Sequence, residues 1–347
     1  MKERLSDIDR ARGFAMCCVV IGHIFSLVDV RKPEMQLGPM IRFLSVFELV
    51  IFFVISGYLF YKHHESSFSI FLKKKVKGLL LPYFVFSVLN MLFFIFVEST
   101  QQMGIPDMLV TTLSFYGISV LWFFPTLLLG ETFWWGLHNK LKTGGGMLAA
   151  TILMIVVGVS HNYMLPVEAS VWTSSEIALI GNNVLVVLMR GLVCLFFVGV
   201  GHCFGLLEEK WKGCRAWNYI MWLVLLGGIL ITGYVPVVNL RELVWESTIL
   251  WCISATLISV GIIFFFQKTT KLKLFPLEFI GKNSLIIMCT HLDFKIPIIC
   301  MSLAEILVSI SPRAKNYIYW GTLFVVLIII EVILVIGWNF ICKKGVD

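Results

Sequence analysis

The sequence is poor in charge and has no long polar segment. Of its 347 residues only 14% are charged and 59% are hydrophobic, whereas water-soluble proteins have about 25% charged and about 45–50% apolar residues. This deficit excludes a separate water-soluble domain, because no stretch is polar enough to enclose one. The excess of apolar side chains must face lipid, so we expect an integral membrane protein.

Two further absences narrow the function. The nine cysteines show no paired spacing typical of a metal site, and most lie in apolar runs, so we interpret them as core residues and expect no metal. The basic start of the chain leads into an apolar run without a small-residue cleavage site. This pattern predicts a retained first transmembrane helix, not a signal peptide.

Ten apolar windows are long enough to cross a bilayer, which takes about 20 residues per helix. They lie near residues 13–30, 43–61, 79–97, 119–137, 147–163, 181–207, 217–235, 247–266, 277–308 and 317–341. The window 277–308 is too long for one untilted helix and contains Lys295 and Pro297, so we expect it to be broken. Residues 108–118 are a weaker candidate for a surface helix, and the glycines at 144–146 indicate an internal turn. The predicted fold class is an all-α, polytopic membrane helix bundle that forms one domain over residues 1–347.

The basic residues are distributed unevenly between the predicted loops. The formal net charge of +7 would suit nucleic acid binding, but with ten spans nineteen of the 28 Lys and Arg residues fall in internal loops and six in external loops. Cytoplasmic loops are enriched in Lys and Arg. The asymmetry therefore predicts that both termini are cytoplasmic, and it argues against a nucleic acid partner.

Arg12 and His23 form the most informative polar pair, because ionisable groups inside membrane spans are costly and commonly mark a functional site. Eleven residues separate them, which returns a helix to within about 20° of the same face after a rise of about 16 Å. We expect Arg12 to hold a phosphate at the cytoplasmic boundary and His23 to act deeper in the same channel as a general base. A histidine that only packs between helices fits the helix alone equally well.

Other polar groups give weaker signals. The lysines at residues 73–77 could bind nucleotide phosphates, although such clusters also serve topology or anionic lipids. Ser56 and the following glycine would let a ligand or another helix approach closely, and helix packing is the simpler explanation. Arg190 and Glu331 are expected to pair inside the bundle.

Two later segments supply further candidates. Ser284, His291 and Lys295 have i, i+7 and i+11 spacing, which predicts one polar helical face. His291 is therefore a second catalytic or hydroxyl-binding candidate and Ser284 a candidate sugar contact, with capping or packing as the alternative. Trp122 and Glu131, in LWFFPTLLLGETFWW, are candidate substrate contacts, although such aromatic residues more often form an interfacial belt.

Five short segments give the chain a resemblance to a known family. They are, in chain order, IDRARGFAMCCVVIGH, FFVISGYLF, LLLPYF, LWFFPTLLL and FIGKNSLIIMCTH. As an ordered set covering most of the chain they resemble the acyltransferase-3 family of bacterial membrane O-acyltransferases, particularly fucose 4-O-acetylase-like enzymes that modify surface polysaccharides. Arg12 and His23 stand at the family's Arg–His spacing.

The resemblance implies a multi-pass O-acetyltransferase of the bacterial inner membrane. Its activity would be transfer of an acetyl group from cytoplasmic acetyl-CoA to a sugar hydroxyl of a surface polysaccharide or its lipid-linked precursor. Arg12 and His23 are then expected to be essential. Some relatives carry an extracytoplasmic hydrolase-like domain, whereas only KKGVD follows the last apolar window here, so we expect the membrane domain to act alone.

The resemblance also implies that the basic loop helps to hold CoA. We expect Lys74, Lys75 and Lys77 to contribute, together with Ser56. Where the family commonly has an Arg-x-x-Arg pair, Lys74 and Lys77 are the nearest match, and lysine supplies a point charge instead of a planar fork.

Two alternatives of other classes remain open from the sequence. A transporter or flippase for a glycan intermediate would also need many spans and buried charges, but the inverted repeats typical of transporters are not found. A sensory or scaffold protein would use the polar groups for packing only. Within the enzyme hypothesis, both direct transfer and an acetyl-histidine intermediate are compatible with the sequence.

Overall fold

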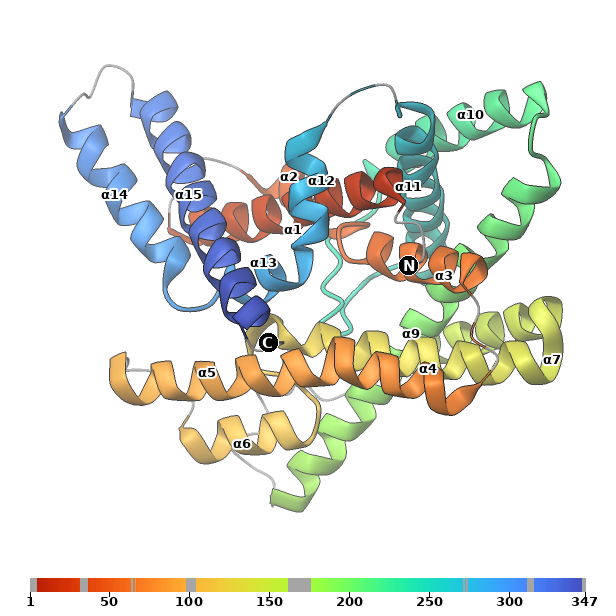
Figure 1. Ribbon diagram of the computed structural model, residues 1–347, viewed down its shortest axis with the longest axis horizontal. Helices are drawn as coiled ribbons and strands as arrows, with labels where there is room; N and C mark the ends of the chain where they lie inside the picture. The colour runs from red at the N-terminus through yellow and green to blue at the C-terminus, as the bar shows by residue number, and fades with distance from the viewer. Residues whose placement is uncertain are drawn as a thin grey trace.

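The protein is a bundle of helices (Figure 1). The computed structural model describes residues 5–31, 37–63, 65, 67–97, 104–161, 176–270, 272, 274–310 and 315–344. Within these ranges the strand-like pairing consists of an isolated bridge between Asn239 and Val244. The predicted all-α, polytopic class is confirmed.

The elements follow one another with short connections. In chain order they are α1 (Ser6–Arg31), α2 (Gly38–Ser45), α3 (Val50–Lys62), α4 (Phe68–Lys75), the π-helix η2 (Val76–Leu80), α5 (Leu81–Val97), α6 (Ile105–Leu113), the 3₁₀-helix η3 (Ser119–Trp122), α7 (Phe123–Ser160), α9 (Glu176–Lys210), α10 (Arg215–Thr232), α11 (Thr248–Lys268), α12 (Phe275–Lys282), α13 (Ser284–Thr290), α14 (Ile296–Ile310) and α15 (Lys315–Lys344).

Eight helical stretches of the described chain are long and apolar enough to cross a membrane. One of them contains α7, whose backbone leaves helical geometry at Lys142, with φ 56° and ψ −179°. A Cβ on Gly146 would lie 3.6 Å from the backbone of Leu137, so the chain reverses here and α7 is two limbs. With α7 counted as two limbs, each of the ten predicted apolar windows overlaps helical structure, and the number of membrane passes stays a prediction. The expected break within residues 277–308 is observed, and α6 covers the first part of the predicted segment 108–118.

The α1–α12 crossing is close enough to require glycine on both sides. A Cβ on Gly13 would lie 1.9 Å from the carbonyl oxygen of Leu277, and one on Gly281 would lie 1.7 Å from that of Asp9. Small residues let helix backbones approach in a membrane. This crossing fixes the end of α1 that carries Arg12.

The α3–α9 crossing has the same reciprocal design. A Cβ on Gly57 would lie 1.9 Å from the carbonyl oxygen of Val198, and one on Gly201 would lie 1.9 Å from that of Val54. Helix packing therefore explains Gly57, whereas its neighbour Ser56 faces a cavity.

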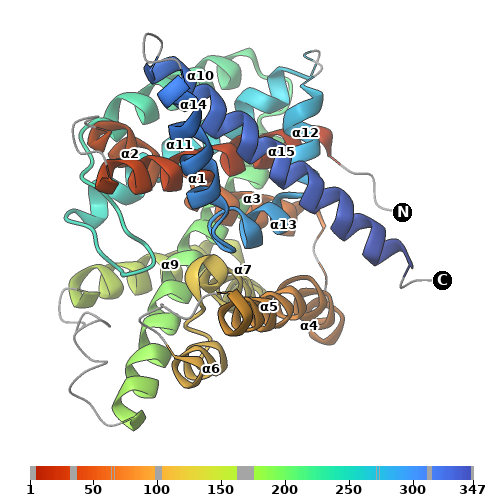
Figure 2. The ribbon, with the colours of Figure 1, turned by 90° about the vertical axis from the view of Figure 1, so that its left-hand side faces the viewer.

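The site lies between two sets of helices. Figure 2 shows α4, α5 and α6 on one side of the molecule and α10, α14 and α15 on the other, with α1 and α3 between them. Arg10 ties α1 to the C-terminal end of α11, because its guanidinium donates to the carbonyl oxygens of Thr269 at 3.1 Å and Leu272 at 3.0 Å. Such capping satisfies carbonyls that a helix end leaves without partners.

Candidate functional site

One cavity, of about 410 Å³, lies at the end of α1 that was predicted to be cytoplasmic, and we call it the inner cavity. Arg12, Ser56, Lys74 and Lys75 are among its lining residues. Four of the five residues expected to contact the donor therefore meet in one cavity. Its positive side chains suit a ligand with phosphate groups.

Lys77 is the exception among the expected donor residues. It is exposed and does not line the inner cavity, where Gly78 and Leu79 lie instead. The expected pairing of Lys74 with Lys77 assumed a regular α-helix, but a π-helix begins at Val76. The wider π turn changes the relative direction of residues three apart, so Lys74 and Lys77 do not line the same cavity in this structure.

A buried carboxylate that does not itself line the inner cavity binds two of the side chains that do. Lys75 Nζ lies 2.5 Å from Glu131 Oε1, the Ser56 hydroxyl donates to the same oxygen, and Glu131 is 1% exposed. Glu131 was expected to contact the sugar beside Trp122. The structure places it with the donor-side residues instead, because nine residues of α7 carry it about 13 Å away from Trp122.

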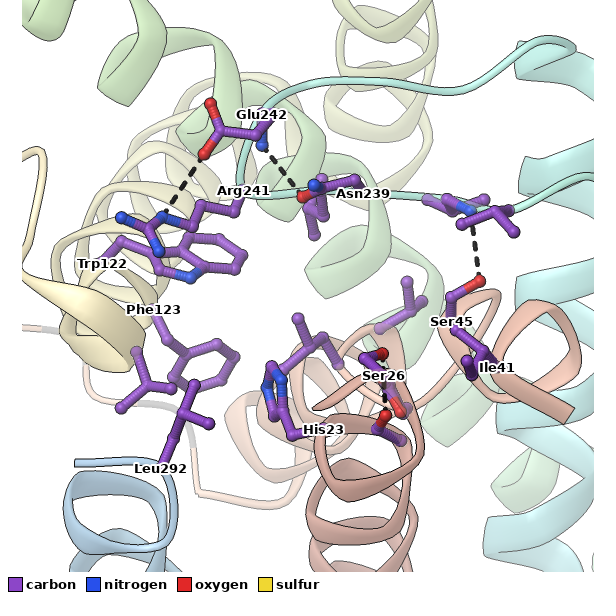
Figure 3. Close-up of a pocket in the computed structure, with 18 of the residues that line it drawn as sticks. His23, Ser26, Ile41, Ser45, Trp122, Phe123, Asn239, Arg241, Glu242 and Leu292 are labelled. Carbon is purple, nitrogen blue, oxygen red and sulfur yellow. Dashed lines mark hydrogen bonds and ion pairs between the residues drawn. The ribbon is translucent and has the colours of Figure 1, made fainter. Parts of the chain in front are cut away.

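The second cavity, of about 430 Å³, contains His23, and we call it the outer cavity. Its other lining residues include Glu48, Trp122, Phe123, Asn239 and Arg241. Figure 3 shows His23 and Phe123 facing each other, with the segment that carries Asn239 and Arg241 passing above them. We call this segment, residues 233–247, the strap. A histidine beside aromatic rings and hydrogen-bonding groups is a setting in which a hydroxyl compound can be bound and deprotonated.

His291, the second catalytic candidate, lies against His23. The two ring centroids are 5.2 Å apart, and His291 is buried. Its Nδ1 lies 2.8 Å from the carbonyl oxygen of Ile287. A carbonyl only accepts, so Nδ1 carries the proton and Nε2 is left as an acceptor.

The expected polar face of Ser284, His291 and Lys295 is not formed. Helix α13 ends at Thr290, and both Phe294 and Lys295 have positive φ, 57° and 58°. Lys295 therefore leaves the helical face, and Ser284 is absent from the residues that line either cavity. The pattern predicted the neighbourhood of His291 but overlooked the turn after it.

Arg190 holds the strap and Trp122 in place, a role that sequence reasoning missed. Its Nε donates to the carbonyl oxygen of Arg241 at 2.8 Å and its Nη1 to that of Tyr116 at 3.0 Å. The guanidinium carbon lies 4.4 Å from the ring centre of Tyr116 and 5.0 Å from that of Trp122. A buried guanidinium that meets carbonyls and ring faces needs no acidic partner.

The predicted pair of Arg190 and Glu331 is wrong for this reason. Glu331 instead accepts a hydrogen bond from the Thr290 hydroxyl at 2.8 Å. No sequence signal marks the acceptors of Arg190, because they are backbone carbonyls, which every residue carries.

The two cavities share no lining residue, so the expected common channel for Arg12 and His23 is not open in this structure. On α1, Met16 and Val19 lie between them and are fully buried. On α3 and α7, Phe53 stacks on Phe123 with 5.3 Å between ring centroids and 8° between ring planes. The predicted single face of α1 is thus divided between two sites by a packed layer.

The fold and these cavities define a class: a multi-pass membrane protein with a basic cavity at one level of a helix and a histidine cavity at another. The sequence profile of the acyltransferase-3 family, described as an acyltransferase domain, matches residues 5–340. The chain therefore belongs to this family and is a multi-pass membrane acyltransferase. Comparisons with curated proteins and with solved structures gave no match.

Proposed function

We propose that the protein transfers an acetyl group from cytoplasmic acetyl-CoA to a sugar hydroxyl of a surface polysaccharide or its lipid-linked precursor in the bacterial inner membrane. The donor would occupy the inner cavity and the acceptor the outer cavity. One observation carries the proposal: α1 presents Arg12 to the lysine-lined cavity and His23 to the cavity of Trp122.

The inner cavity has the charges that a CoA phosphate group needs. Arg12 supplies a planar fork for a phosphate, and Lys74 and Lys75 supply point charges. Both lysines have carboxylate partners in this structure, Glu65 for Lys74 and Glu131 for Lys75. Donor binding would exchange the Lys74 partner for a phosphate at little cost, because that pair is largely exposed.

In the outer cavity His23 is the catalytic residue. Its imidazole takes the proton of the acceptor hydroxyl while the oxygen attacks the thioester carbonyl carbon. The carbon–sulfur bond breaks as the new ester bond forms, and the proton passes from His23 to the departing CoA sulfur. The products are an acetylated sugar and CoA thiol, and no covalent enzyme intermediate is needed.

The thioester has to reach His23 through the packed layer between the cavities. The rise from Arg12 to His23 is about 16 Å along α1, so the donor would lie along the helix with its phosphates at one end and its acetyl group at the other. Phe53 and Phe123 stack across this route. We expect these rings to separate when the donor is bound.

The proposal is tested with the full chain in proteoliposomes. Acetyl-CoA supplied on one side and octyl glycosides on the other should give CoA thiol and an acetylated glycoside, detected by thiol titration and mass spectrometry. His23→Ala should abolish both products while the protein still inserts. Glycoside transport without acetylation would favour a transporter, and equal acetylation by wild type and His23→Ala would overturn the mechanism.

A cellular measurement addresses the acceptor. Surface glycans from cells with and without the gene are compared by mass spectrometry, and an acetyl mass difference identifies both the reaction and the modified glycan. Identical glycan masses in a strain shown to express the protein would contradict the polysaccharide assignment.

A further inference from the structure

Glu48 is a carboxylate in the outer cavity that the proposed transfer does not use. It lies between α2 and α3 and lines the cavity together with His23. A Cβ built on Gly22 would lie 2.4 Å from Glu48 Oε2. The carboxylate thus rests against the backbone of α1 one residue before His23, in space that only glycine leaves open.

One oxygen of this carboxylate is sealed and has no donor in the described part of the chain. Glu48 Oε2 is buried without a hydrogen-bond partner there. Leaving a buried acceptor unsatisfied costs about 1–3 kcal/mol, and more for a charged group. Because Glu48 also lines the outer cavity beside His23, a ligand hydroxyl that enters this cavity can donate to its carboxyl group.

The other charged side chains that line the cavity, Arg241 and Glu242, form an ion pair with each other. Arg241 Nε lies 3.4 Å from Glu242 Oε1, and the other carboxylate oxygen of Glu242 accepts from the Tyr116 hydroxyl at 3.2 Å. Arg241 is therefore ion-paired with its neighbour in the chain, although its buried Nε makes no hydrogen bond among the described residues. A neutral polyol would bring a hydroxyl donor for the Glu48 carboxyl group without burying a further charge in the cavity.

The geometry points to Glu48 as the residue that binds a second acceptor hydroxyl, adjacent to the one that His23 deprotonates. We propose, on the basis of the proposed function, that the outer cavity selects uncharged sugars with two neighbouring free hydroxyls. One hydroxyl would donate its proton to His23 and become acetylated. The other would donate a hydrogen bond to Glu48 and orient the ring.

Trp122 supplies the remaining contact that such a ring needs. Its side chain is buried, and the Arg190 guanidinium lies over its ring at 5.0 Å. The indole is thereby fixed from one side while it lines the cavity. Flat apolar faces of this kind complement the carbon–hydrogen face of a sugar, so hydroxyl contacts at Glu48 and His23 would set which edge is modified.

The test combines variants of the full chain with deoxygenated acceptors. Octyl β-D-galactopyranoside, octyl β-D-glucopyranoside and their 2-, 3-, 4- and 6-deoxy forms are assayed with saturating acetyl-CoA, and mass spectrometry locates the acetyl group. Wild type should lose roughly 10- to 100-fold in kcat/KM when a hydroxyl next to the acetylated one is removed. Glu48→Gln exchanges the carboxyl group for a weaker amide acceptor, so it should lose part of this factor on the parent glycoside and little more on that deoxy form, because both changes act on the same contact.

Gly22→Ala and Glu242→Gln make the test specific. The alanine Cβ would displace the Glu48 carboxylate, so Gly22→Ala should reproduce the Glu48→Gln pattern without removing a charge. Glu242→Gln changes a carboxylate of the same cavity that is already paired, and it should act equally on parent and deoxy glycosides.

The inference and the proposed function fail differently. If the Glu48→Gln factor is the same on parent and deoxy acceptors, Glu48 does not bind a neighbouring hydroxyl and the inference is overturned. If wild type acetylates a uronic acid glycoside better than the neutral glycosides, the selection of uncharged sugars is overturned. If wild type acetylates none of the glycosides, the proposed function itself is contradicted.

Discussion

The inner and outer cavities are nearly equal in size, about 410 and 430 Å³, but they are built from opposite chemistry. The inner cavity has an arginine and two lysines, and two carboxylates hold the lysines. The outer cavity has a histidine among aromatic rings, and its polar strap is attached through backbone carbonyls. One helix, α1, serves both, so a single element can position a phosphate-bearing donor and a neutral acceptor at separate levels.

The two cavities also differ in what holds them together. Side-chain ion pairs on α4 shape the inner cavity, and its Lys74–Glu65 pair is partly exposed to solvent. Buried hydrogen bonds fix the outer cavity, including those of Arg190 and the Trp251 indole, which donates to the Val46 carbonyl at 3.0 Å. We therefore expect outer-cavity substitutions to change both stability and activity, and inner-cavity substitutions to change mainly donor affinity.

The largest expected effect separates catalysis from donor binding. His23→Ala should lower transfer by about 10²- to 10⁴-fold, because it removes the general base. Isothermal titration of acetyl-CoA to the same variant in detergent should give an unchanged Kd, since Arg12, Lys74 and Lys75 remain. A parallel loss of acetyl-CoA affinity would show that the two cavities do not act separately.

The next effect tests the inner cavity through Arg12. Arg12→Ala should raise the KM for acetyl-CoA by roughly 10- to 100-fold, because a charge-assisted contact to phosphate contributes about 1.5–3 kcal/mol. The KM for the glycoside acceptor should stay the same. Arg12→Lys is the matched variant, and it should recover part of the loss because it restores charge without the planar fork.

A comparable but different effect is expected at Arg190, which does not line the outer cavity but holds its strap and Trp122. Arg190→Leu leaves the Arg241 and Tyr116 carbonyls without their donors, which should lower the free energy of unfolding by a few kcal/mol. The strap would loosen over His23, so the KM for the acceptor should rise while that for acetyl-CoA changes little. Thermal unfolding in detergent and the two KM values measure this. A raised acetyl-CoA KM alone would contradict the assignment of Arg190 to the outer cavity.

The sequence predicted the helices and the positions of Arg12 and His23 along α1, because both follow from periodicity. The apolar windows coincide with the helices, and the eleven-residue spacing of Arg12 and His23 places them on one continuous helix, α1. The packing between two helices could not be predicted from periodicity. The closed layer of Phe53 and Phe123 depends on packing of α3 against α7, which no local pattern specifies.

Errors arose where local geometry or distant backbone decides the outcome. The π-turn after Lys75 and the positive φ values at Phe294 and Lys295 interrupt patterns that assume a regular helix. The acceptors of Arg190 are carbonyls 51 and 74 residues away in the chain. The expected acidic partner was wrong because acceptors on loop backbone leave no mark in the pattern of side chains.

The smallest expected effect distinguishes Lys74 from Lys77 at the inner cavity. Lys74 lines that cavity and Lys77 does not, although both belong to one short basic run. Lys74→Ala should raise the KM for acetyl-CoA by a few fold, because an exposed lysine–phosphate contact contributes up to about 1 kcal/mol. The Lys74 effect should shrink as salt rises from 0.05 to about 0.5 M, since exposed charges are screened over a Debye length of about 10 Å at 0.1 M.

Lys77→Ala is the matched control: it removes the same charge from the same loop and should leave the KM for acetyl-CoA unchanged at every salt concentration. Equal effects of the two variants would mean that the loop attracts the donor by its overall charge, and the directional role of the π-turn would be lost.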